Sequence, residues 1–266
     1  MSDFLCFLLA GGSAGLLAGL FGIGGGLVIV PVLALVLASQ VPADAVLPLA
    51  LGTSLAAIVF SASSSAWGHY RRGAVDLSLV KSALPLLLVG AVVGALGASW
   101  APHVLLAAFL AVFQAGVCVY MVRKTYYAGT STAPAVERSH SRPLFGVIGA
   151  ICAMGGIGGG TLCVPYFSHL GVAPRTAVGT SAALGIPIAL AAALAYCTAG
   201  LLQGVELPHS IGYVHLTALA GMVPGVIIGA QGGAALAHRL QSKLLMGLFC
   251  AFLALSSAKT LAAVLG

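Results

Sequence analysis

Long apolar stretches alternate with short polar ones along nearly the whole chain. The apolar stretches lie at about 4–20, 27–39, 46–66, 78–99, 103–122, 143–156, 161–170, 177–198, 211–233 and 241–264. Six of them reach or approach the ~20 residues that an α-helix needs to cross a bilayer. The pattern therefore predicts an all-α polytopic membrane protein.

The other four stretches are short and form two pairs, 4–20 with 27–39 and 143–156 with 161–170. A cluster of glycines separates the two members of each pair. Because consecutive glycines unwind a helix readily, we expect each pair to be a glycine-broken hairpin, re-entrant or half-length. The alternative is that each pair forms one continuous span, which gives eight plain spans.

The two halves of the chain repeat the same motifs in the same order. The segment 21–31 (FGIGGGLVIVP) aligns with 155–165 (GGIGGGTLCVP), and Gly-Thr-Ser occurs at 52–54 and again at 179–181. Such recurrence indicates a duplication. We therefore divide the chain into a first transmembrane repeat (1–125), a cytoplasmic linker (126–142) and a second transmembrane repeat (143–266).

The cations distinguish parallel from inverted repeats. If each short pair is a hairpin, ten of the eleven Lys and Arg residues share one side of the membrane and only Lys259 is opposite. Continuous spans give a poorer eight-to-three division, and cytoplasmic loops are enriched in Lys and Arg. We therefore expect two inverted repeats, each with a broken hairpin and three full transmembrane helices. The loops 67–81 and 123–142 would be cytoplasmic and both termini periplasmic.

Composition indicates that lipid surrounds most of the chain, and we expect the cell inner membrane. Sixty per cent of its residues are hydrophobic, 6% are charged and the mean hydropathy is +1.12, whereas a soluble domain carries about 25% charged residues. The net charge of +6 comes from cations scattered in loops, so we expect a lipid partner and no nucleic acid. No basic segment or cleavage site marks a signal peptide.

The two glycine clusters are the first candidate for an anion site. Exposed N–H groups in an unwound segment, together with the positive end of the helix that follows, attract negative charge without a buried Arg. The candidate residues are Gly24, Gly25 and Gly26 in the first copy and Gly158, Gly159 and Gly160 in the second. The alternative role of these glycines is close helix packing.

Hydroxyl side chains in both copies are the second candidate. Thr53, Ser54, Thr180 and Ser181 stand early in long spans, where they can cap a helix or donate to an oxyanion. Five further residues are candidates for the transport pathway or for proton linkage: Ser61, Ser64, His69, Arg71 and His215. For Ser61 and Ser64 the alternative is a hydrogen bond within the helix, and for His69 and Arg71 an interfacial position.

Several kinds of chemistry lack the residues they need. The five acidic residues all fall in termini or loops, so the intramembrane carboxylates that usually couple transport to protons or sodium are missing. The six cysteines form no CxxC pair and fit small buried hydrophobic residues. We expect no catalytic residues, no metal, no cofactor and no enzyme activity.

The chain resembles the TauE/SafE family of sulfite and organosulfonate exporters over nearly its whole length. The resemblance is carried by 15–31 with its glycines and Pro31, by 52–65 with Gly-Thr-Ser and the serines that follow, by HYRRGAVD at 69–76, and by the second-copy motifs. One departure is YCTAG at 196–200, which replaces the basic run. The resemblance implies seven to nine spans and a small anionic substrate such as sulfite or sulfoacetate.

Taken together, these features predict a secondary transporter that exports a small oxyanion across the inner membrane by alternating access. A passive anion channel and a sulfonate or sulfate importer have the same sequence features. A membrane scaffold without transport activity is an alternative of another class. The oligomeric state stays open, and a homodimer is compatible with the sequence.

Overall fold

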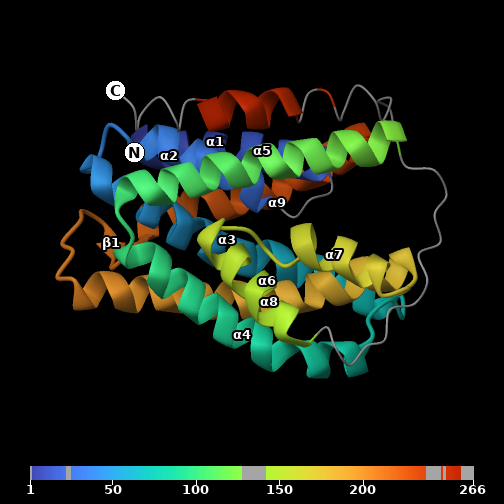
Figure 1. The fold of residues 1–266 in the computed structure, drawn as a ribbon. Coiled ribbons are helices and arrows are strands. Elements are labelled where there is room, and N and C mark those ends of the chain that lie inside the picture. The colour runs from blue at the N-terminus through green and yellow to red at the C-terminus, as the bar shows by residue number, and fades with distance from the viewer. Residues whose placement is uncertain (1, 22–24, 128–141, 238–246, 248–249, 259–266) are drawn as a thin grey trace.

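The computed structural model describes residues 2–21, 25–127, 142–237, 247 and 250–258 (Figure 1). The described helices are α1 (Ser2–Phe21), α2 (Gly26–Leu37), α3 (Ala43–Arg71), α4 (Leu77–Trp100), α5 (His103–Tyr127), α6 (Arg142–Met154), α7 (Gly160–His169), α8 (Pro174–Leu202) and α9 (Leu216–Ala237). Residues 250–258 are also helical. Two short strands, β1 (Ser210–Ile211) and β2 (Val214–His215), form an antiparallel hairpin before α9.

Four of the described helices are long and apolar enough to cross a bilayer. They are Ala43–Arg71, Leu77–Trp100, His103–Tyr120 and Pro174–Leu202. Four apolar segments are shorter: Phe4–Leu16, Gly26–Leu37, Pro143–Met154 and Leu216–Gly229. The prediction of an all-α polytopic membrane protein is confirmed.

The two longest helices, α3 and α8, end in the same way. After α3, Gly73 adopts a positive φ of 65°, and the N–H groups of Gly73 and Ala74 donate to the carbonyls of Tyr70 and His69. After α8, Gly204 has φ 66° and an equivalent pair of bonds closes the last turn. Both are Schellman caps, in which glycine accepts the left-handed conformation without a steric penalty.

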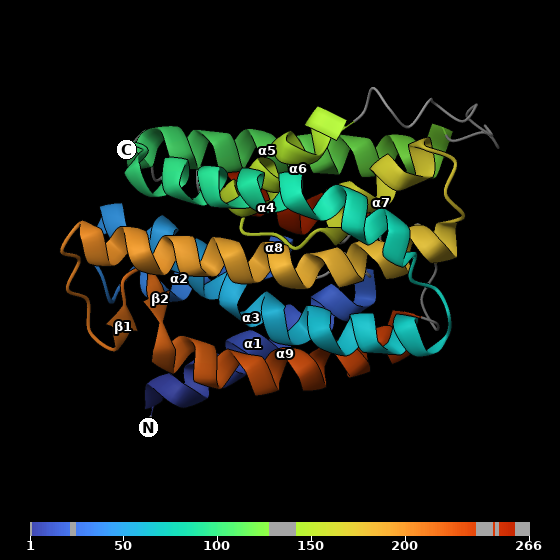
Figure 2. The ribbon, with the colours of Figure 1, turned by 90° about the horizontal axis from the view of Figure 1, so that it is seen from below.

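The helices α3 and α8 run antiparallel to each other. Near its start, α3 contacts the start of α9 through Thr53 and His215. Near its start, α8 contacts the start of α4 through Thr180 and Asp76. Because only the short 72–76 loop joins α3 to α4, the start of α8 lies beside the end of α3. Figures 1 and 2 show this arrangement from two sides.

The first helix of each half packs against the fourth helix of the other half. Helix α1 runs along α9, and α6 runs along α4 in the same direction as α4. Gly15 lies against Val226 in the first pair and Gly149 against Leu87 in the second, so closely that a Cβ at either glycine would overlap the partner backbone. Helix α6 therefore starts at the end of the molecule where α4 starts, and α7 returns the chain to that end, where α8 begins.

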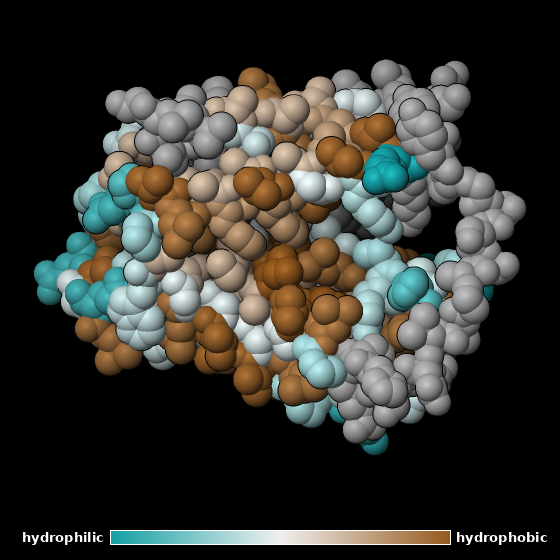
Figure 3. Space-filling view, in the orientation of Figure 1, coloured by the Kyte–Doolittle hydropathy of each residue, from teal (hydrophilic) through white to brown (hydrophobic). Residues whose placement is uncertain are grey.

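The ends of the molecule differ from its middle. The start of α1 and the β1–β2 hairpin lie at one end, and the α3–α4 loop lies at the opposite end (Figures 1 and 2). In Figure 3 a brown apolar surface fills the middle of this face, and hydrophilic residues gather towards both ends. Exposed charged side chains mark these ends, such as Glu206 at the first and Arg71 and Arg72 at the second. This distribution fits a bilayer around the middle of the molecule.

Candidate functional site

The second glycine cluster separates α6 from α7. At the end of α6, Gly156 adopts φ 62°, its N–H donates to the Ala153 carbonyl (3.2 Å), and the Ile157 N–H donates to the Cys152 carbonyl (2.9 Å). This Schellman cap ends α6 inside the protein. Three residues later Gly159 caps the start of α7, whose first helical residue is Gly160. The chain therefore breaks and reverses direction at the cluster.

The first glycine cluster separates α1 from α2, and Gly24 lies outside the described residues. Gly25 has φ 82° and caps α2, where its carbonyl accepts the N–H groups of Val28 and Ile29 (both 2.9 Å). Valine or any other L-residue at position 25 would be strained in this conformation. Both predicted breaks in the helices are therefore present in the fold.

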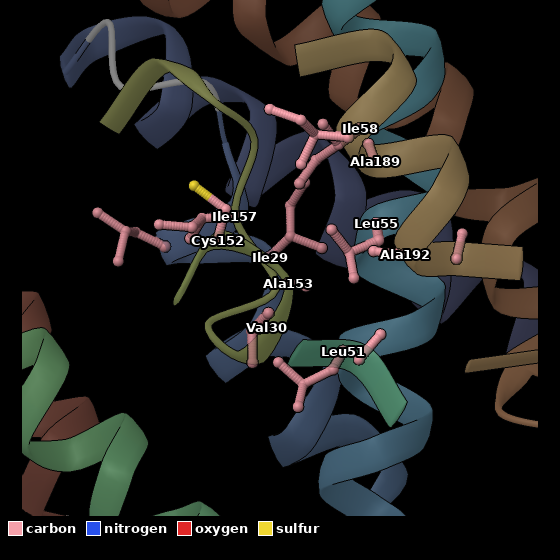
Figure 4. Packing of buried hydrophobic residues seen from close by; sticks show 14 of the residues in the cluster. Ile29, Val30, Leu51, Leu55, Ile58, Cys152, Ala153, Ile157, Ala189 and Ala192 are labelled. Atoms are coloured by element: carbon pink, nitrogen blue, oxygen red, sulfur yellow. The ribbon is translucent and has the colours of Figure 1, made fainter. Parts of the chain in front are cut away.

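The two breaks meet in the interior of the protein. A Cβ built on Gly26 would lie 2.5 Å from the Gly156 carbonyl oxygen and 2.6 Å from Ile157 Cα. Ile58 of α3 packs beside both breaks, since its side chain approaches the Cβ positions of Gly26 (3.0 Å) and Gly158 (3.1 Å). Figure 4 shows Ile58 among the apolar side chains around this contact. Apolar packing therefore fills the space directly between the breaks.

Thr53 and Thr180 make matching contacts across the two halves. The His215 N–H donates to Thr53 Oγ1 (2.9 Å), and the Asp76 N–H donates to Thr180 Oγ1 (3.0 Å). Thr53 of the first half thus holds the residue that precedes α9 in the second half. Thr180 of the second half holds the residue that precedes α4 in the first half. Both hydroxyls therefore have a structural role as acceptors of a backbone N–H. Substrate contact by either threonine stays a prediction.

The two serines that follow these threonines differ. Ser54 Oγ donates to the Gly156 carbonyl (3.0 Å) and so holds the second break. Ser181 Oγ is buried and has no hydrogen-bond partner among the described residues. An unpaired buried hydroxyl costs free energy, on the order of 1–3 kcal/mol, unless a ligand or water satisfies it.

Ser181 stands beside the start of α7. A Cβ built on Gly159 would meet the Ser181 carbonyl oxygen (3.3 Å), Ile188 Cδ1 (3.3 Å) and Gly185 N (3.5 Å). These three residues follow an i, i+4, i+7 spacing and so form one face of α8. Ser181 belongs to this face, and its carbonyl oxygen lies beside the residue that caps α7.

The start of α7 has free space and a positive potential. No described atom lies within 4 Å of a Cβ built on Gly160. The first N–H groups of a helix have no partner within the helix, and the helix dipole places partial positive charge there. The buried polar side chains in the described part of the chain are Thr53, Ser54, Ser99, Gln114, Thr180, Ser181 and His215. None of these is a carboxylate, so no buried negative charge opposes an anion at α7.

Four of the predicted pathway residues lie on α3, between the turn after Ile58 and the end of the helix. Ser61 Oγ donates to the Ile58 carbonyl (3.2 Å) within α3, and Ser64 is exposed. His69 is partly buried and Arg71 is exposed at the end of α3. In Figure 3 the surface is recessed between the far end of α5 and α7, at this same end of the molecule.

His215 is buried at the opposite end of the protein. Its Nδ1 accepts the Ala218 N–H (3.1 Å), so the imidazole caps α9 as Asp76 caps α4. Its ring also packs on Phe7 at a centroid distance of 5.4 Å. A proton on Nδ1 would remove this cap. The contacts therefore assign His215 a structural use, and a role in proton linkage stays a prediction.

Sequence reasoning overlooked two buried polar side chains. Gln114 lies in the middle of α5 with its carbonyl oxygen buried and unpaired. The Tyr196 hydroxyl donates to the Ala153 carbonyl (3.4 Å) at the end of α6. A polar residue inside an apolar stretch is itself a signal, so Gln114 could have been found from its position in 103–122.

Metal ligation has no support in the described part of the chain. No group of three or more His, Cys, Asp or Glu side chains there lies close enough together to hold a metal ion. The site therefore offers main-chain N–H groups and one unpaired hydroxyl as its polar groups.

Comparison with known proteins gives a consistent result. The family model for "Sulfite exporter TauE/SafE" matches residues 7–260. A probable membrane transporter protein of Haemophilus influenzae is 32% identical over 256 residues, with 94% of each chain covered. The probable membrane transporter proteins YunE and YdhB of Bacillus subtilis are 27% and 26% identical, covering 91% and 82% of this chain and 91% and 85% of their own lengths. No solved structure matches.

Proposed function

Because this chain belongs to the sulfite exporter TauE/SafE family and is a multi-pass membrane transporter, we propose that it exports a small oxyanion across the inner membrane. The substrate class is sulfite, sulfoacetate or a related organosulfonate, and the mechanism is alternating access. The observation that carries the proposal is the buried, unpaired hydroxyl of Ser181 beside the start of α7.

The site suits a compact oxyanion better than a cation. Its donors are the N–H groups at the α7 N-terminus and the Ser181 hydroxyl, and all of these bind negative charge. The open space at Gly160 gives an anion room to approach the N–H groups. In our proposal the anion contacts Gly159, Gly160 and Ser181. Among the other predicted residues, Ser54 holds the second break, and Thr53 and Thr180 join the two halves.

The arrangement of the halves supports inverted repeats. Helices α3 and α8 carry the same Gly-Thr-Ser motif and the same C-terminal cap, yet they run antiparallel. Their threonines make exchanged contacts with the starts of α9 and α4. Inverted repeats place a transporter's site at the interface of the repeats and let one part rock against the other.

Export needs no buried carboxylate. The exposed Arg71 and Arg72 place positive charge at the end of the molecule that we assign to the cytoplasm. The described surface is recessed at that end (Figure 3). Since the cell interior is negative, each unit of negative charge that leaves gains ~2.3 kcal/mol per 100 mV. Membrane potential is therefore a sufficient driving force for efflux.

The test is thermal stabilisation of the purified protein by sulfite, sulfoacetate, sulfate and chloride. We expect sulfite or sulfoacetate to raise the unfolding temperature more than chloride does. Ser181→Ala should weaken this effect about tenfold in apparent affinity, because a hydrogen bond to a charged group contributes about 1.5–3 kcal/mol. Ser54→Ala is the matched control, which should lower stability and leave the affinity nearly unchanged.

Other outcomes would favour the rival functions. If none of the anions stabilises the protein, the result would favour a scaffold. Equal anion affinity of wild type and Ser181→Ala would contradict the assignment of the site to the start of α7. Counterflow in vesicles separates a transporter from a channel. Only a transporter accumulates labelled anion inside vesicles in exchange for unlabelled anion that leaves them. Uptake into energised right-side-out vesicles would indicate an importer.

A further inference from the structure

Two cysteines from opposite halves of the chain face each other across a pair of helices. The Cys118 thiol of α5 donates to the Cys250 carbonyl (4.0 Å), and the Cys250 thiol donates to the Cys118 carbonyl (3.9 Å). A contact made in both directions places each sulfur next to the backbone of the other residue.

The surrounding contacts fix the relative direction of the two helices. Ser257 Oγ donates to the Ala111 carbonyl (3.1 Å), about two turns from the cysteine pair on both helices. Because 250 lies beside 118 and 257 beside 111, the 250–258 segment runs antiparallel to α5. Two separated contacts hold this register, so the thiols do not depend on a single contact to stay together.

The pair is more accessible than the other closely spaced thiols of the described chain. Cys118 and Cys250 are each partly buried, whereas Cys152 and Cys163, beside the second break, are fully buried. A small neutral oxidant can enter the bilayer and reach a partly buried thiol. The membrane therefore does not protect Cys118 and Cys250 as the protein core protects Cys152 and Cys163.

We propose that Cys118 and Cys250 form a redox-sensitive thiol pair that hydrogen peroxide converts into a disulfide between α5 and the 250–258 segment. Peroxide first oxidises one thiol to a sulfenic acid and is itself reduced to water. The second thiol then displaces hydroxide from the sulfenic sulfur, its proton leaves with the hydroxide as a second water, and the S–S bond forms. Two electrons pass from the two sulfurs to the peroxide.

The disulfide would join the last described helix of the first half to the last described helix of the second half. A disulfide requires the two Cα atoms to approach within about 7 Å and the Cβ atoms to point towards each other. The reciprocal thiol-to-carbonyl contacts place each sulfur against the backbone of the other residue, as a short link between the two helices requires. Reduction by a dithiol restores the free pair by thiol–disulfide exchange. The pair would thus link the two halves reversibly.

The test treats the full chain in membrane vesicles with hydrogen peroxide, then alkylates free thiols, digests without reductant and identifies linked peptides by mass spectrometry. We expect a peptide that joins Cys118 to Cys250, which disappears after dithiothreitol. Cys118→Ser and Cys250→Ser should each abolish it, and Cys6→Ser should not. Unfolding temperatures of the variants show that they remain folded.

Two results would overturn the proposal. One is that both thiols stay fully alkylatable while the exposed Cys6 is oxidised under the same conditions. The other is a link from Cys118 of one molecule to Cys118 of a second, which would show that the thiols meet between copies. Neither readout depends on transport, so the outcome is independent of the proposed export of an anion.

Discussion

At the scale of single residues, the glycines of the two clusters are not equivalent. Gly26 and Gly156 allow the two breaks to touch, because a Cβ on Gly26 would lie 2.5 Å from the Gly156 carbonyl oxygen. Gly160 meets no described atom within 4 Å and leaves space at the start of α7. One glycine serves packing and the other leaves room for a ligand, so the same substitution should act differently at each.

Gly26→Ala should destabilise the protein, and Gly160→Ala should weaken anion binding. The first places a methyl group against rigid backbone, which costs about 1–3 kcal/mol as overpacking does. The second adds a methyl group at the proposed anion position and favours the helix by up to about 1 kcal/mol. Unfolding temperature with and without sulfite measures both effects. Unchanged affinity in a stable Gly160→Ala variant would contradict the proposed site.

At the scale of secondary-structure elements, the two ends of the molecule are built differently. The α3–α4 connection is the short 72–76 loop, whereas residues 203–215 between α8 and α9 include the β1–β2 hairpin. Here the Tyr213 hydroxyl donates to Gln203 Oε1 (2.8 Å), and Gln203 Nε2 donates to the Ser99 carbonyl (3.1 Å). These bonds tie the hairpin to the ends of α8 and α4.

Ionisation of Tyr213 should loosen this connection at alkaline pH. Burial, and then the negative charge of Asp44, raise the pKa of Tyr213 above its usual value of 10.0. The unfolded chain then loses this proton first, so the free energy of unfolding falls as pH rises above about 10. We expect Tyr213→Phe to be less stable by about 1 kcal/mol at pH 8, through the loss of one hydrogen bond, and to decline less steeply above pH 10.

Thermal unfolding between pH 8 and pH 11 measures this difference. Tyr70→Phe, at an exposed tyrosine at the other end of the molecule, is the matched control and should follow the wild type. An identical alkaline decline in wild type and Tyr213→Phe would show that the hydroxyl does not hold the hairpin.

At the scale of the whole molecule, the hairpin made by α6 and α7 determines which loops share a side of the membrane. Because the chain reverses at 155–159, the 170–173 loop lies at the same end as the 72–76 loop. The β1–β2 hairpin lies at the opposite end (Figure 1). A continuous span through 143–170 would instead place 170–173 opposite 72–76.

Labelling with a membrane-impermeant maleimide should reveal this topology in intact cells. In a variant without native cysteines, we expect Glu206→Cys to react from outside, and Gly73→Cys and Ala173→Cys to react only after the cells are opened. All three positions are exposed on the described surface. Opposite labelling of Gly73→Cys and Ala173→Cys would exclude the hairpin and, with it, the inverted repeat.

Much of the local structure followed from residue types. The glycine clusters predicted both breaks, since only glycine accepts the positive φ seen at Gly25 and Gly156 at little cost. The partners of Thr53 and Thr180 could not be predicted, because each lies across the two halves at a separation of more than 100 residues. Pairwise contacts at such separations depend on how helices cross, which no local pattern encodes.

The candidate site was predicted as a symmetrical one, and the structure distinguishes its two halves. The matching serines Ser54 and Ser181 both follow a Gly-Thr pair, yet one donates to Gly156 and the other has no partner among the described residues. Side chains such as Ile58 fill the centre between the breaks. A repeated motif shows that two environments are related, and it does not show that they are equal.

By itself, the sequence determined that this protein lies in a bilayer and that glycines separate two pairs of short helices, and it predicted a duplicated helical unit. These properties depend on composition and on local backbone freedom. Only the tertiary structure decided that the two breaks touch, that Ser181 is left without a partner beside α7, and that Cys118 meets Cys250. These contacts depend on how two halves that are similar but not identical pack against each other, which no local sequence pattern encodes.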